Sequence, residues 1–193
     1  MLSSIHPLGE RGRNNRWGWT AGAFAVGAMA AGATAGAGLG AVGSLLGLDR
    51  LPVLAIVALV AGAAALLDAR RIEPLGPRRQ VNERWIGAYR GWVYGVSFGA
   101  QLGAGGATYI VTWLVYAAAT AAALTGNVAG GAVVGLVFGA MRTVPVLAAR
   151  WIDRPSRLGV FHKRMATLGP QVRTATILLG VIAALSAVGG IVA

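Results

Sequence analysis

One stretch of the chain, from Trp92 to Leu124, constrains the fold more than any other. It contains no charged residue and is apolar apart from a few polar side chains such as Gln101. As a single helix it would rise about 50 Å at 1.5 Å per residue, whereas the hydrocarbon core of a bilayer is about 30 Å thick. The stretch therefore either tilts strongly and protrudes, or breaks within the glycine-rich segment 103–106.

This segment allows two interpretations. Glycines beside polar side chains in a membrane span are typical of a discontinuous helix that lines a site, because irregular backbone is tolerated there only where protein or water satisfies it. Small residues also allow two helices to pack closely, with no site at all. The polar neighbours that favour a site are Gln101, Thr108 and Tyr109. Both interpretations stay open at the level of sequence.

Composition indicates a polytopic membrane protein. Of the 193 residues, 56% are hydrophobic and 12% charged, the mean hydropathy is +0.65, and several uncharged runs are long enough to span a bilayer. The formal net charge is +11. Because the arginines lie between the apolar runs, without an aromatic platform among them, we expect anionic lipid rather than nucleic acid as their partner.

Several kinds of chemistry find no support. The chain has no cysteine, which excludes thiol chemistry, disulfides and cysteine-ligated metals. Its two histidines, His6 and His162, lie in polar flanks, which argues against a histidine metal site. The glycine run lacks the Gly-Lys-Ser/Thr of a phosphate loop, and no nucleophile with a neighbouring base stands out. We predict no enzyme activity, no catalytic residue, no metal and no cofactor.

The apolar runs predict an all-α fold that forms one integral membrane domain over residues 1–193. About five transmembrane helices are expected, at 17–48, 52–67, 92–124, 129–149 and 174–192. Two of them, 17–48 and 92–124, are long and glycine-rich and therefore candidates for a break. In the first run, glycines at 32, 36, 40 and 43 form a ridge that lets another helix approach closely.

Two basic loops connect these runs, at 68–91 and 150–173. In the first, Val81, Trp85 and Tyr89 recur every fourth residue, and between Pro155 and Pro170 the second also shows helical spacing. We expect an interfacial amphipathic helix in each. Cytoplasmic loops are enriched in Lys and Arg. The chain is thus predicted to lie in a bacterial inner (plasma) membrane, with its N-terminus in the cytoplasm and its C-terminus outside.

Arg142 is the charged residue that lies deepest in a predicted span. It is about 12 Å from the cytoplasmic end of that span, and Gln101 is about 13 Å from the same face on the preceding antiparallel span, so the two can meet at one level. In the alternative interpretation, Arg142 snorkels to the headgroups or pairs with Asp68, and Asp68 itself caps its span. The candidate substrate-binding residues are Gln101, Gly103, Gly105, Gly106, Thr108, Tyr109 and Arg142.

The sequence Phe98-Gly-Ala-Gln-Leu-Gly-Ala-Gly-Gly-Ala-Thr108, with the paired glycine-rich spans, resembles the transmembrane thiol-electron carriers of the CcdA/DsbD type, which serve cytochrome c biogenesis. In that family a glycine-rich span leads into a Thr or Ser, Pro, Cys site. Here Thr108 stands in the first position, and Tyr109 and Ile110 replace the reactive residues. The resemblance therefore implies a related scaffold that does not carry out the family's reaction.

These observations predict a small transporter or exporter that moves a solute or ion through a site in the glycine-rich third span. The alternative is a non-catalytic accessory or scaffold subunit of a larger membrane complex, and a membrane enzyme ranks third. Expected partners are the lipid bilayer, with anionic lipid at the arginine-rich loops, and either a second copy of the chain or a larger membrane complex.

Overall fold

The computed structural model describes residues 5–47, 49–78, 81 and 84–192, and their regular elements are all helical. Four of the helices are long and apolar enough to cross a bilayer: α2, α3, α7 together with η2, and α8. The expected all-α architecture is thus found in the described residues. The elements are α1 (Pro7–Gly12), α2 (Trp17–Ser44), α3 (Arg50–Ala69), α4 (Trp85–Ala88), α5 (Gly91–Gly103), α6 (Leu114–Leu124), α7 (Val128–Ala148), η2 (Ala149–Trp151) and α8 (Pro155–Val192).

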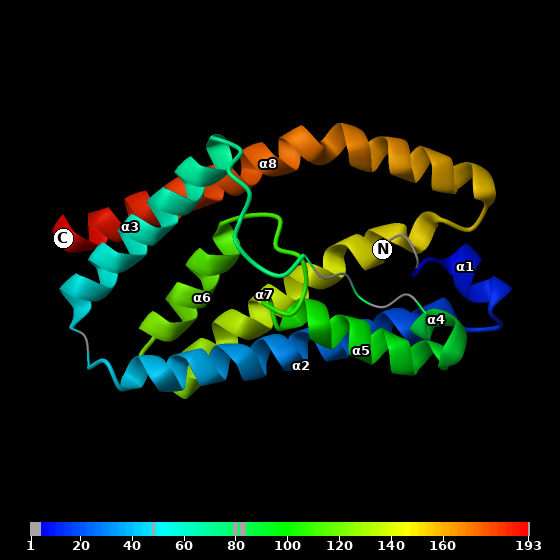
Figure 1. The fold of residues 1–193 in the computed structure, drawn as a ribbon, viewed down its shortest axis with the longest axis horizontal. Helices are drawn as coiled ribbons and strands as arrows, with labels where there is room; N and C mark the ends of the chain where they lie inside the picture. Colours follow the sequence, from blue (N-terminus) through cyan, green and yellow to red (C-terminus); the bar gives the residue numbers. More distant parts are fainter. Residues whose placement is uncertain (1–4, 48, 79–80, 82–83, 193) are drawn as a thin grey trace.

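Helix α2 is the centre of the fold, and α5 and α7 pack along it (Figure 1). The first residue of α5, Gly91, lies against Thr20, and its last, Gly103, lies against Ala28, so α2 and α5 run parallel. Helix α7 runs antiparallel to α2, because Gly131 faces Gly36 and Gly139 faces Ala28. The two helices therefore meet α2 backbone to backbone, mostly through glycine.

The glycine ridge predicted in the first apolar run is confirmed as a contact surface. A Cβ atom at Gly36 would overlap the carbonyl oxygen of Gly131, so only glycine fits at this crossing. Gly32 and Gly40 meet the backbone of α7 and its N-cap residue in the same way, and Gly43 meets the carbonyl of Ala123 in α6. Close approach of this kind stabilises helix pairs through van der Waals contact. Because the ridge is covered within one chain, a homo-oligomer would have to use another surface.

A second pair of helices, α3 and α8, lies beside this bundle (Figure 1). They are antiparallel, since Gly180 contacts Ala65 while Gly190 contacts Leu54 near the start of α3. Helix α6 connects the two groups, because it packs on α2, α3 and α7. The fold is thus a three-helix bundle and a helix pair joined by α6.

The apolar stretch 92–124 breaks in the middle. Helix α5 ends at Gly103, α6 begins at Leu114, and the ten residues between them are irregular. Gly105 has a φ of +74°, a conformation that glycine adopts without the steric cost of a Cβ atom. Of the two possibilities that length allowed, a protruding helix or a broken one, the structure shows the broken one.

Residues 155–192 differ from the prediction, which separated an interfacial helix from a last span at 174. They form one continuous helix, α8, with Pro170 inside it. Proline removes one backbone hydrogen bond and commonly kinks a helix, and Gly169 beside it is also a weak helix former, yet α8 continues past both residues. The hydroxyl of Thr174 donates to the carbonyl of Pro170 at 3.1 Å, which adds a side-chain hydrogen bond in the turn after the proline.

The loop 68–91 also differs from the prediction. Among its described residues between α3 and α5, the helical part is the four residues of α4, and the backbone at Tyr89 is already extended. Residues 82–83, which lie between Val81 and Trp85 of the expected stripe, are outside the described residues. The loop begins midway along the molecule rather than at the end where α1 lies (Figure 1). Helix α3 is about 30 Å long, whereas α2 is about 42 Å long. Helix α3 therefore ends before the level at which α2 begins.

Candidate functional site

The break in the third apolar segment is fastened to α3 by Asp68. The carboxylate of Asp68 accepts a hydrogen bond from the Thr112 hydroxyl at 2.6 Å and from the Trp113 backbone N–H at 3.0 Å. Helix α6 begins at Leu114, and the side chain of its N-cap residue, Trp113, makes no capping hydrogen bond. Asp68 therefore satisfies a free N–H at the start of this helix. The sequence alternative in which Asp68 caps its own span is replaced by a cap on a different helix.

Asp68 also joins α3 to α8. The guanidinium of Arg173 donates from Nε at 3.1 Å and from a terminal nitrogen at 2.5 Å to the backbone carbonyl of Asp68. This carbonyl lies in the last turn of α3, where four carbonyls have no partner within the helix. One residue therefore fixes the relative positions of α3, α6 and α8 at the break.

Residues 72–76, which follow Asp68 in the chain, form a covering segment over the break. The indole Nε1–H of Trp113 donates to the carbonyl of Ile72 at 2.9 Å, and the Tyr116 hydroxyl donates to the carbonyl of Leu75. Next to this segment lies a hollow of about 400 Å³. Its polar and charged lining comes from α3, the break, the covering segment and α8: Asp68, Arg71, Glu73, Tyr109, Thr112, Arg173 and Thr176. The break thus borders a space that carries side chains of both charges.

A second cavity, of about 240 Å³, lies on the other side of the break. Gly103, Gly105 and Gly106 line it together with the middle of α2, from Gly32 to Leu39, and with residues of α6 and α7. Among the described residues its lining is apolar except for Tyr116. Such a cavity suits packing or an apolar group, and it offers no charge to a polar solute.

The structure places the seven predicted site residues in different surroundings. The three glycines line the apolar cavity, and Tyr109 lines the polar hollow. Thr108 is buried within the break. No hydrogen bond between Gln101 and Arg142 is found among the described residues: the Gln101 amide donates to the Ser97 carbonyl at 3.3 Å.

The guanidinium of Arg142 lies 5.0 Å from the centre of the Phe138 ring, in cation–π geometry. Phe138 in turn lines the apolar cavity. The suggested pair of Arg142 with Asp68 is absent among the described residues, because the Asp68 carboxylate is taken by Thr112 and Trp113. Arg142 is therefore held by an aromatic face rather than by an acid.

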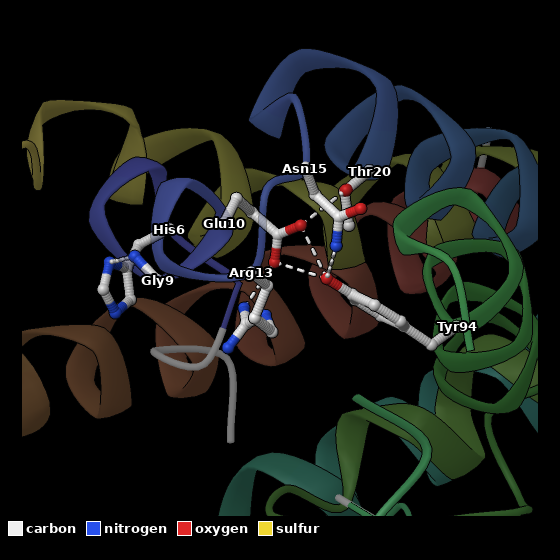
Figure 2. A network of polar contacts seen from close by, with 7 residues as sticks. All are labelled: His6, Gly9, Glu10, Arg13, Asn15, Thr20 and Tyr94. Atoms are coloured by element: carbon white, nitrogen blue, oxygen red, sulfur yellow. Dashed lines mark hydrogen bonds and ion pairs between the residues drawn. The ribbon is translucent and has the colours of Figure 1, made fainter. Parts of the chain in front are cut away.

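Figure 2 shows a polar cluster that sequence reasoning did not predict. Glu10 of α1 is fully buried, and its carboxylate accepts hydrogen bonds from the Tyr94 hydroxyl at 2.5 and 2.6 Å and from the Thr20 hydroxyl at 2.8 Å. Arg13 forms an ion pair with it at 2.5 Å. The described segment before α2 thus includes a helix, α1, that is bonded to both α2 and α5.

The Glu10 cluster holds the N-terminal segment in place. Both carboxylate oxygens have donors within the chain, as buried polar groups require. The Leu8 N–H donates to the Ile152 carbonyl at 3.0 Å, which also ties α1 to the end of α7. No sequence signal distinguishes Glu10, because a single acid among arginines is the usual composition of a solvated tail.

Comparison of the chain with family models, with curated proteins and with solved structures gave no significant match.

Proposed function

We propose that this chain is an integral protein of a bacterial inner membrane, of the transporter or exporter type, and that it moves a small polar solute or ion. The observation that carries the proposal is the break between α5 and α6, which borders a hollow with acidic and basic side chains. The N-terminus and α1 lie in the cytoplasm in this proposal, and the C-terminus lies outside, as the arginine distribution favours.

The hollow at the break lies at the level of the middle of the bundle. The break lies beside the middle of α2, since the cavity on its other face is lined by residues 32–39 of that helix. If α2 crosses the bilayer, Asp68 and Arg173 lie well inside it. A charged side chain there costs about 2.5–3.5 kcal/mol on insertion scales unless it is paired or hydrated, and such residues commonly mark solute pathways.

The described side chains have distinct roles in this proposal. Asp68 positions the start of α6, and the covering segment 72–76 fixes the break from outside. Tyr109, Arg71 and Arg173 line the hollow and are the groups that a solute would meet. The glycines at 103, 105 and 106 allow the backbone to turn between α5 and α6.

The absence of cysteine makes the natural chain a background for single-cysteine labelling. Tyr109→Cys and Thr112→Cys in the hollow are compared with Leu59→Cys, at an apolar position of α3 that is 73% exposed and would face lipid. Intact cells and inverted vesicles are treated with a membrane-impermeant thiol reagent. We expect Tyr109→Cys to react from at least one side and Leu59→Cys to remain unlabelled from both, because the charged reagent needs water.

The labelling experiment has a positive control, Arg11→Cys on exposed α1, which reports that the reagent reached one side. If Arg11→Cys reacts while Tyr109→Cys and Thr112→Cys stay unlabelled in folded protein, no water reaches the break. The transport proposal then fails.

An accessory or scaffold subunit of a larger membrane complex is the second candidate. It is favoured by the first half of α8, residues 155–172, which is mostly exposed, while α8 as a whole packs chiefly on α3. Val160, Met165 and Leu168 are apolar and exposed there. A dry break in the labelling experiment, with this helix face free for a partner, would support the accessory role.

A further inference from the structure

A hollow of about 870 Å³ lies between the first half of α2 and the beginning of α5, apart from the break. At one end it is lined by Arg16 and Arg90, the residues that directly precede the two helices. Trp19 and Trp92 flank it and are 71% and 57% exposed. Val26 and Val96 line its other end, and no acidic residue among those described contributes to the lining. The hollow is therefore basic at one end and apolar at the other.

The two arginines are available to a ligand. Neither side chain has a hydrogen-bond or ion-pair partner among the described residues, and neither caps its helix with its side chain. By contrast, neighbouring Arg13 is engaged by Glu10. Two guanidinium groups at one rim, without a carboxylate between them, form a site for an anion such as phosphate, which guanidinium binds through paired hydrogen bonds.

The wall of the hollow has room for an extended chain. Gly18 and Gly22 face open space, and Ala23 beside them is small. From Arg16 to Val26 helix α2 rises about 15 Å, which is half of the roughly 30 Å hydrocarbon core, or one leaflet. The tryptophans lie near the arginine end, at the level where these side chains prefer the interface between headgroups and acyl chains.

We propose that this hollow binds one anionic phospholipid. Its phosphate lies between Arg16 and Arg90, and one acyl chain follows Gly22, Val26 and Val96 toward the bilayer centre. A free phosphate would leave the apolar part of the hollow empty, whereas a phospholipid matches both ends. The proposal requires that α2 and α5 lie in a bilayer, and it does not depend on transport through the break.

The first test measures lipid binding by the full chain in mild detergent, by native mass spectrometry, with dioleoyl phosphatidylglycerol and dioleoyl phosphatidylcholine as probes. Both lipids carry a phosphate, but the choline cation of phosphatidylcholine is repelled by the two arginines, so we expect one phosphatidylglycerol to bind about tenfold more tightly. The double variant Arg16→Gln, Arg90→Gln loses this preference. Arg11→Gln removes a charge from an exposed position outside the hollow and keeps the preference. An equal loss in Arg11→Gln would show diffuse attraction to basic protein and overturn the proposal.

The second test blocks the acyl-chain part with Gly22→Leu. Gly38→Leu is the matched control, since both glycines lie on α2 with open space at the Cβ position, but Gly38 is outside the hollow. Circular dichroism and gel filtration confirm that both variants fold. We expect Gly22→Leu to weaken binding of both lipids about tenfold and Gly38→Leu to leave it unchanged. If Gly22→Leu binds normally, or millimolar inorganic phosphate displaces the lipid, the site accepts only a headgroup-sized anion and the phospholipid proposal is wrong.

Discussion

Glu10 is the acidic side chain with the largest number of polar partners in the described part of the chain. Its carboxylate has Tyr94, Thr20 and Arg13 around it, in a position closed to water. An ionised carboxylate survives in such a place because each oxygen is bonded and a guanidinium balances the charge. The cluster consequently makes the position of α1 depend on one residue.

Glu10→Ala should release α1 from the bundle. The substitution leaves the Tyr94 hydroxyl, the Thr20 hydroxyl and the Arg13 guanidinium without their acceptor, and removing one member of a buried ion pair costs about 3–5 kcal/mol. Limited trypsin digestion measures the result, since cleavage after arginines 11, 13 and 16 requires the backbone around them to unfold locally, and we expect cleavage there to accelerate at least tenfold.

The control for this prediction is Glu73→Ala. Glu73 pairs with Arg78 at 3.4 Å on the surface, where both side chains are well exposed, and such pairs contribute about 0–1 kcal/mol. Digestion of Glu73→Ala near the N-terminus should match that of the natural chain. An unchanged digestion of Glu10→Ala would mean that α1 is held by its apolar contacts alone.

His6 makes the start of α1 sensitive to pH. Its Nδ1 accepts the Gly9 backbone N–H at 3.1 Å, which requires that nitrogen to be unprotonated. Burial of the ring, helped by the positive charge of Arg13, lowers the pKa of His6 below its ordinary value of 6.5. The unfolded segment therefore binds more protons than the docked one as pH falls, so the contribution of His6 to stability is present above about 6.5 and is lost below it.

Hydrogen exchange of the α1 amides, expressed relative to their intrinsic rates, tests this behaviour between pH 7.5 and 5.5. We expect protection to fall several-fold toward the acidic end. In His6→Asn the side chain still accepts the Gly9 N–H, because asparagine is a favourable N-cap residue, but it does not titrate. Protection in His6→Asn should be independent of pH over this range, and a fall equal to that of the natural chain would exclude His6 as its source.

At the scale of elements, the contact between α2 and α7 leaves no room for a methyl group. In Gly36→Ala the new Cβ meets the Gly131 carbonyl, and overpacking of this kind costs about 1–3 kcal/mol. Gly38→Ala, on the same helix, faces open space and gains up to about 1 kcal/mol of helix propensity. Thermal unfolding followed by circular dichroism in detergent should show a lower Tm for Gly36→Ala and an equal or higher one for Gly38→Ala.

The elements that sequence predicted well are those with a strong local signal. Uncharged runs located α2, α3 and α7, and the clash between the length of 92–124 and the thickness of a bilayer pointed to a break at the glycines. Local patterns predicted the wrong helix boundaries where contacts between distant segments determine the structure. Pro170 suggested a boundary, yet α8 continues through it, supported by its packing on α3.

Part of the candidate site was also predictable, because some of its residues lie within a stretch that has a strong local signal. Tyr109 was identified because it follows the glycine cluster, and it does line the polar hollow. Its neighbours Asp68 and Arg173 come from positions far away in the sequence and meet only through the fold, at a separation of 105 residues. Equal depth from one membrane face suggested that Gln101 and Arg142 meet, but depth does not determine the side of the helix, and they bond elsewhere.

At the scale of the whole molecule, the charges separate along its length. Helix α1, the start of α5 and the end of α7 lie together at one end, while the C-terminus lies at the other (Figure 1). The first end carries several arginines, among them Arg11, Arg13, Arg16, Arg90 and Arg150. This arrangement is the basis for the proposed orientation, because basic residues next to spans favour the cytoplasmic side.

The pairing of helices also has a consequence for synthesis. Helix α2 emerges from the ribosome first, but α5 and α7, which cover its glycines, follow after about 50–100 further residues, and α3 waits as long for α8. At roughly 5–20 residues per second, the uncovered backbone of α2 is present for several seconds before its partners exist. During that interval the glycines of α2 have no partner helix within the chain, so the order of translation becomes a determinant of correct assembly.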